Sequence, residues 1–317
     1  MQLQSMSENR CITESYVHAE ILNEWILTYD QVSAGKFESY LREISFDDIQ
    51  IYEERFVPSI FQRGLAKKNS LCIGMFSQLS NNAIWLGKNI TGHEILSCYD
   101  EGEILLRLPE NSAFYSLTIP FNLLNDHNLQ YNHAKYGHIL EAQYSEIFYR
   151  KFTQLLNDVL KNSHLIQNSA TQQQVKSEIL ALGDDFLSVL NAHHQPIRVS
   201  NQKAQNVVKT VCEVLNDNPD YCYSIEELCH ITCTSRRTLQ NCFEQITGQS
   251  PALFLKMMKL NAVRRMLQYS STQMTISDIA AHWGFWHLSQ FAVDYKRLFG
   301  ESPSQTMLYK KSKLILC

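Results

Sequence analysis

The stretch SRRTLQNCFEQI, residues 235–246, combines several side chains that can each make two hydrogen bonds in one plane. They are Arg236, Arg237, Gln240 and Asn241. The apolar residues Leu239, Phe243 and Ile246 recur at helical spacing, which predicts a helix that buries them and exposes the polar face. Arginine can pair with guanine through two parallel bonds, and Gln or Asn with adenine, each pair contributing about 1 to 3 kcal/mol of discrimination. The exposed face is therefore predicted to contact base edges, and a merely solvated helix face is the alternative.

A second stretch with related chemistry lies at 284–303, GFWHLSQFAVDYKRLFGESP. Its candidate base contacts are His287, Ser289 and Gln290. The apolar residues Trp286 and Leu288 stand among them, so whether this stretch reads bases is left open. Two roles are open for Leu288, contact with a thymine methyl group or partial burial.

Basic residues around these two stretches are candidates for phosphate contacts, which add salt-dependent affinity without sequence information. The candidates are Lys256, Lys259, Lys296 and Arg297. Two neighbouring arginines, Arg264 and Arg265, have an alternative role as partners of acidic side chains inside the same domain.

Residues 224–251 and 275–303 form an internal repeat. Leu239 matches Phe291 and Gly248 matches Gly300 once one extra residue is allowed in the second copy. Each copy predicts a short helix, a tight turn and a longer helix that ends at Gly before Ser-Pro, which is a helix-turn-helix. Residues 252–269 between them predict a connector helix. If it holds the two recognition helices about 34 Å apart, one turn of B-DNA, both can enter successive major grooves.

Residues 205–310 resemble the DNA-binding domain of the AraC/XylS family of bacterial transcription regulators. The resemblance rests on both copies of the repeat, on KLNAVRRML, and on the pattern GFxxxSxFxxxYKxxFGxSP. It implies a transcription regulator, more often an activator than a repressor, with double-stranded DNA and RNA polymerase as partners. It also implies base-contacting roles for Arg237, Gln240 and Asn241. The stretch YDQVSAGKFESYLREISFDDIQIYEE is similar to a subgroup of that family, the regulators of ethanolamine-utilisation operons.

The N-terminal half predicts a different architecture. Short β-branched or aromatic segments broken by Gly, Asn, Asp and Pro indicate strands at about 37–119, and helical periodicity follows at about 120–195. The polar stretch HHQPIRVSNQ predicts a boundary near residue 200, which gives an α+β protein of two domains, 1–200 and 201–317. The family resemblance implies that the first is a cupin-like antiparallel β-barrel that binds an effector, followed by helices that support dimerisation.

Any effector pocket in the strand region is predicted to be apolar with a few polar groups. Cys72, Trp85 and Tyr99 are candidate lining residues, with core packing as the alternative for each. The effector itself stays open, as a small amine or another metabolite. We expect no cofactor and no metal, because His93 stands alone among the strands and Cys229 and Cys233 have the spacing of one buried helical face.

The amphipathic stretch at 136–160 has more apolar residues than one buried stripe needs. They are Ile139, Leu140, Tyr144, Ile147, Phe148, Phe152, Leu155 and Leu156. This surplus predicts a homodimer interface, and packing against the strands is the alternative.

Composition limits the remaining classes of function. The chain has 317 residues and a formal net charge of −4, made up of −7 for residues 1–204 and +3 for 205–317, so the C-terminal part suits an acidic partner. No apolar run approaches the roughly 18 to 20 residues of a membrane span, and no secretory signal is visible, which predicts a cytoplasmic protein. A DNA-repair enzyme with a nucleophilic Cys in a Pro-Cys-His-Arg context is disfavoured, because that tetrapeptide does not occur. A constitutive regulator, with the barrel serving only for assembly, stays open.

Overall fold

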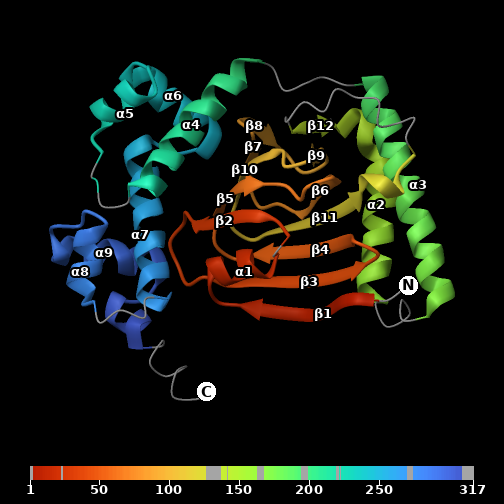
Figure 1. Cartoon of the computed structure of the whole chain (residues 1–317), viewed down its shortest axis with the longest axis horizontal. Coiled ribbons are helices and arrows are strands. Elements are labelled where there is room, and N and C mark those ends of the chain that lie inside the picture. The colour runs from red at the N-terminus through yellow and green to blue at the C-terminus, as the bar shows by residue number, and fades with distance from the viewer. Residues whose placement is uncertain are drawn as a thin grey trace.

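The computed structural model describes residues 3–22, 24–125, 137–140, 142–162, 168–193, 199–218, 221, 223–269 and 274–308. Figure 1 shows two stacked sheets at the centre, with a pair of long helices on one side and a cluster of shorter helices on the other. The first part is a mixture of strands and helices, and the C-terminal part is helical, so the fold is α+β.

Twelve strands within the described residues make up the two sheets. They are β1 (Leu3–Ile12), β2 (Ile26–Gln31), β3 (Ser39–Phe46), β4 (Ile49–Phe56), β5 (Ile60–Leu65), β6 (Ser70–Gln78), β7 (Ala83–Trp85), β8 (Lys88–Ile90), β9 (Ile95–Tyr99), β10 (Glu103–Leu108), β11 (Ser112–Pro120) and β12 (His138–Leu140). The larger sheet has the order β1-β3-β4-β11-β6-β9-β12, and the smaller has β2-β5-β10-β7-β8. The paired strands are antiparallel, and among the described residues the two sheets are not joined into one closed barrel.

The described helices flank these sheets. They are α1 (Ser15–Ile21), η1 (Phe121–Leu123), α2 (Ala142–Lys161), α3 (Ser169–His193), α4 (Val199–Asp217), α5 (Ile225–Ile231), α6 (Arg236–Thr247), α7 (Pro251–Tyr269), α8 (Ile276–His282) and α9 (Leu288–Phe299). None of the described helices is long and apolar enough to cross a membrane.

The larger sheet buries one face under α2 and α3. Phe152 of α2 and Phe186 of α3 are fully buried with Ile73 and Ile119 of the sheet in one apolar cluster. Since successive strand residues point to opposite faces, Cys72 beside Ile73 faces the other way, toward the smaller sheet.

The smaller sheet is buried against the C-terminal helices. Phe61 of β5 contacts Phe254 of α7 with ring centroids 5.0 Å apart, and Phe254 contacts Phe243 of α6 at 5.5 Å. All three side chains have 0% exposure, in a cluster that also includes residues of α4. One continuous core therefore joins the β-rich part to the first unit of the repeat and the start of α7. The second unit, α8 and α9, forms a separate core with the rest of α7.

Three elements differ from the sequence-based expectation. The strands begin at Leu3 rather than near residue 37, since β1 and β2 precede that point. Part of the predicted helical stretch 136–160 is strand β12, in which Ile139 and Leu140 pair with Leu96 and Ile95 of β9. The open edge of β9 supplies hydrogen bonds there that the helical periodicity of the segment does not reveal.

The core between the sheet and α7 makes a testable prediction. We expect Phe254→Ala to destabilise the protein by about 3 to 5 kcal/mol, because it leaves a cavity between two other buried rings. Leu253, its neighbour in the chain, is 44% exposed, so Leu253→Ala is the matched control and should change stability by no more than about 0.5 kcal/mol. Thermal unfolding of the full chain measures both, and equal midpoints for the two variants would contradict this packing.

Candidate nucleic-acid interface and cavity

The first helix-turn-helix consists of α5 and α6, and local hydrogen bonds fix where each helix begins. Ser224 and Glu227 form a capping box at the start of α5. Ser235 accepts a hydrogen bond from the Thr238 N–H at 3.1 Å at the start of α6. Gly248 ends α6 with φ of 69°, a left-handed conformation that Gly adopts without steric cost.

The polar residues predicted to contact bases lie along α6. Arg236, Arg237 and Asn241 are exposed, and Arg236 is 3.4 Å from a carboxylate oxygen of Glu226 on α5. Gln240 is half-buried and donates to the Glu244 carboxylate at 2.5 Å. The opposite face, Leu239, Phe243 and Ile246, has 0% exposure. The helix thus presents a polar face to solvent while its apolar face holds it in place.

The second helix-turn-helix consists of α8 and α9 and repeats this construction. Thr275 and Asp278 form a capping box at the start of α8, and Gly300 ends α9 with φ of 70°. His287, Ser289 and Gln290 are exposed around the start of α9.

The turn of each unit has one residue in the left-handed conformation, at the same position in both units. It is Cys233 in the first unit, with φ of 50°, and Gly284 in the second, with φ of 75°. In each unit the following residue donates its N–H to the carbonyl five residues back, Thr234 to Cys229 and Phe285 to Ala280. The first turn therefore places a side chain in a conformation that costs about 1 kcal/mol relative to Gly.

Exchanging the residues at this turn position tests the equivalence. We expect Cys233→Gly to raise the free energy of unfolding by about 0.5 to 1 kcal/mol and Gly284→Cys to lower it by a similar amount or more. Chemical denaturation measures the free energy of unfolding of each variant, and so the expected increase in one and decrease in the other. A loss of stability in Cys233→Gly would show that the thiol contributes more than the backbone strain costs.

The predicted phosphate contacts differ in their surroundings. Lys296 and Arg297 are exposed on α9. Lys256 is half-buried, and its Nζ lies 2.6 Å from Asp294. Burial raises the pKa of the Asp294 carboxyl, but hydrogen bonds from Lys256 and Gln290 outweigh it and the pKa is lowered. Lys259 is also half-buried on α7.

Arg264 and Arg265 of α7 form ion pairs with acidic residues from both ends of the chain. Arg264 makes two 2.7 Å hydrogen bonds with Glu14 and lies 2.9 Å from Glu301. Arg265 lies 2.8 Å from Asp30, which is fully buried and also 3.3 Å from Arg63. Pairing with an acid of the same domain, the alternative role of these arginines, thus holds for Arg264 and Glu301. The other two partners, Glu14 and Asp30, come from the β-rich part.

Two further residues join α7 to β2. The Gln31 N–H donates to Asn261 Oδ1 at 3.0 Å, and Asn261 Nδ2 donates back to Gln31 O at 2.9 Å, so a side-chain amide continues the edge of the sheet. Gln31 Nε2 also donates to Leu298 O of α9 at 2.8 Å. Since all these groups are buried, the recognition helices have a defined position against the sheet.

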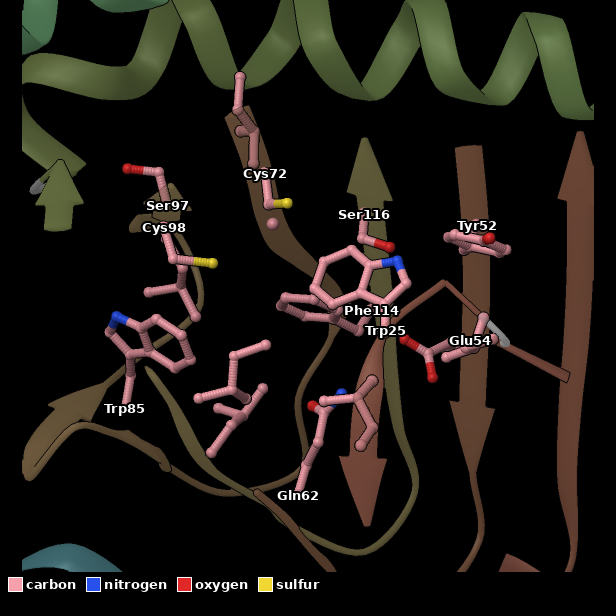
Figure 2. Close-up of a pocket in the computed structure, with 17 residues that line it drawn as sticks. Trp25, Tyr52, Glu54, Gln62, Cys72, Trp85, Ser97, Cys98, Phe114 and Ser116 are labelled. Carbon is pink, nitrogen blue, oxygen red and sulfur yellow. The ribbon is translucent and has the colours of Figure 1, made fainter. Parts of the chain in front are cut away.

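A cavity of about 50 Å³ lies between the two sheets. Figure 2 shows the side chains around it, with the Trp25 indole near the middle of the view. Cys72 and Trp85, two of the predicted lining residues, border the cavity. Tyr99 does not, because Cys98 beside it faces the cavity and Tyr99 therefore points to the opposite face of β9, against Phe121.

The principal polar groups of the cavity are not among the residues predicted to line it. Glu54 and Gln62 border it, and the Glu54 Oε1 atom accepts a hydrogen bond from the Tyr29 hydroxyl at 2.7 Å and lies 3.0 Å from His18 Nε2. The Trp25 Nε1 atom is buried without a hydrogen-bond partner among the described residues. Strand alternation places Glu54 on one face with Tyr52, but only the second sheet shows that this face encloses a cavity.

Strand β5 contacts the cavity and the C-terminal helices through adjacent residues. Gln62 borders the cavity, whereas Phe61 packs on Phe254 of α7 and Arg63 pairs with Asp30. Burial lowers the pKa of Arg63, but Asp30 outweighs this and the pKa is raised. A displacement of β5 by a bound molecule would therefore reach α7 directly.

Among the described residues, no group of three or more His, Cys, Asp or Glu side chains is placed to hold a metal ion.

Comparison with known proteins agrees with the geometry of the repeat. A family model described as "Helix-turn-helix domain" matches residues 228–308. The "XylDLEGF operon transcriptional activator 2" of Pseudomonas putida is 35% identical over 106 residues, which cover 33% of this chain and 68% of that protein. The chain belongs to the AraC/XylS family of helix-turn-helix transcription regulators.

Two further matches differ in the share of the matched protein that they cover. The "XylDLEGF operon transcriptional activator" of the same organism is 32% identical over 125 residues, 39% of this chain and 38% of that protein. A crystal structure of a probable AraC family transcriptional regulator from Rhodopseudomonas palustris CGA009 is 33% identical, covers 33% of this chain and 97% of that chain, and has a TM-score of 0.31.

Proposed function

We propose that the chain is a sequence-specific DNA-binding transcription regulator, an activator, that responds to a small-molecule effector. The observation that carries this proposal is the pair of helix-turn-helix units on one connector, each with an exposed recognition helix. In this assignment residues 1–200 bind the effector and residues 201–317 bind DNA.

In this role α6 contacts bases in one major groove and α9 enters the next. Arg237, Gln240 and Asn241 are the base contacts that the family resemblance favours, and Arg236 lies on the same exposed side of α6. Lys296 and Arg297 contact phosphates, because they are exposed at the far end of α9. The helix α7 has 19 residues, so it separates the units by up to about 28 Å along its axis.

Two alanine variants separate base readout from phosphate binding. We expect Arg237→Ala to relax base preference at one operator position and cost about 1 to 3 kcal/mol. We expect Lys296→Ala to weaken binding to all sequences and to reduce the slope of log K against log salt by about 1. Titrations of operator variants at several salt concentrations measure both, and an unchanged ranking of operators by Arg237→Ala would remove that residue from the readout.

The effector site in this proposal is the cavity between the sheets, whose arrangement suits an open form of the cupin-like barrel. Its lining has a single carboxylate, Glu54, no Lys or Arg, and the aromatic rings of Trp25, Tyr52, Trp85 and Phe114. A carboxylate beside aromatic faces favours a small cation such as a primary amine.

Ligand-dependent stability tests the effector site. We expect ethanolamine, or another small amine of a panel that includes neutral and anionic analogues, to raise the unfolding temperature, with about 2.7 kcal/mol of stabilisation at 100 times Kd. Glu54→Gln should abolish the shift. Tyr99→Phe, which alters a side chain on the opposite face of β9, should keep it. A panel without any stabilising compound would favour the constitutive regulator.

The remaining partners follow from this assignment. We infer contact with RNA polymerase from the family, a cytoplasmic location from the position of the chromosome, and a homodimer through α2. On that helix Ile147 is 75% exposed, whereas Phe148 beside it is buried in the core. Ile147 is therefore the residue of this stretch that offers apolar surface to a second copy of the chain. Relatives of the chain are regulators, which supports a role without catalysis.

A further inference from the structure

The second unit carries one residue that the first lacks, in the turn before its recognition helix, and backbone hydrogen bonds identify it. Phe285 is equivalent to Thr234, because each donates to the carbonyl five residues back in its turn. His287 is equivalent to Ser235, because each accepts the first hydrogen bond of the following helix through its carbonyl. The residue between them, Trp286, has no counterpart. Its side chain is 71% exposed at the start of α9.

The faces of the two helices then match residue by residue, because both have 12 residues and both end at a left-handed Gly. The four positions predicted to contact bases in α6 correspond in α9 to Leu288, Ser289, Ala292 and Val293. All four are exposed, with Leu288 at 44% and Val293 at 52%. Leu288, Ala292 and Val293, together with Trp286 just before the helix, form a surface that we call the apolar face of α9. Its three members within the helix stand where the first unit presents Arg236, Gln240 and Asn241. Ser289 stands at the position of Arg237.

Charge indicates what covers this face. Lys296 and Arg297 follow it on the same helix and are exposed, at the positions that Glu244 and Gln245 occupy in α6. Cations beside an apolar surface suit a partner with both phosphates and apolar groups. The major groove is such a partner, because thymine presents its C5-methyl group there. The position of the face is also the one that α6 uses for bases in the proposed function.

We propose that α9 recognises thymine through its C5-methyl groups, with the apolar face of α9 as the contacting surface. Ser289 is the one polar residue at the four positions, and its hydroxyl can donate a hydrogen bond to a base edge or accept one from it. The two units would then read a bipartite operator by different chemistry, hydrogen bonds at the first half-site and methyl contacts at the second. This inference rests on the proposed DNA-binding function.

Replacing thymine by deoxyuridine tests the inference, because the exchange removes the methyl group and keeps every hydrogen-bonding group of the base. The full chain first selects operators from random duplexes, and footprinting assigns the half-sites. We expect thymines at the half-site of α9, and a loss of about fourfold in Kd for each contacted methyl replaced, as burial of a methyl-sized group predicts. Replacing thymines at the half-site of α6 should change Kd less.

Variants of exposed residues on α9 show which side chains contact the methyl groups. Leu288→Ser and Val293→Ser should bind the deoxyuridine operator as the unaltered chain does and should lose the preference for thymine, with unchanged unfolding temperatures. Lys296→Ala is the control, because it should weaken binding to both operators by the same factor. This result would assign the methyl contact to the apolar face of α9.

Three outcomes overturn the inference and differ from one another. Equal affinity for thymine and deoxyuridine operators, with specific binding intact, would refute methyl recognition and leave the proposed function standing. Absence of any specific DNA binding would refute the proposed function itself. If Leu288→Ser and Val293→Ser change self-association or binding of RNA polymerase while the thymine preference stays, a protein covers the face instead.

Discussion

The smaller sheet packs against α4, α6 and α7, and the position of the first helix-turn-helix depends on this contact. Phe61, Phe254 and Phe243 form its centre, all fully buried. The first helix-turn-helix shares its core with the sheet, so burial there adds much of its stability, whereas α8 and α9 have a core with α7. The same strands enclose the cavity on their other face, which leaves little room for β5 to move without moving α7.

Charge reinforces this arrangement at its edges. Asp30 is fully buried between Arg63 and Arg265, and Glu14 binds Arg264 through two hydrogen bonds. A buried carboxylate is costly unless it is paired, so each arginine is tied to the contact between the parts of the chain. The positive charge of the C-terminal part is therefore not all available to DNA. The exposed residues of α6 and the end of α9 carry what remains on the recognition helices.

The repeat shows how one supersecondary unit can present two kinds of exposed surface. Capping boxes, a left-handed turn residue and a left-handed Gly after the second helix fix the backbone of both copies. These features leave the outward positions free to differ, since those side chains do not support the core. In α6 they are long and polar, and in α9 they are mainly apolar and preceded by the inserted Trp286.

The amino-acid sequence determines the repeat by itself. Ser224 with Glu227, Thr275 with Asp278, and the stop at Gly300 act over a few residues, so their signals survive without any tertiary context. Helix periodicity likewise places Leu239, Phe243 and Ile246 on a buried face, as the structure has them.

Tertiary structure alone decides the contacts between distant segments. Asn261 and Gln31 are 230 residues apart, Arg264 and Glu14 are 250 apart, and no local pattern pairs them. The strand β12 forms because β9 offers an unpaired edge, and Glu54 faces a cavity because a second sheet covers it. Such pairings depend on which surfaces meet when the whole chain packs. The free energy that favours this packing is shared among many residues, so no short segment encodes it.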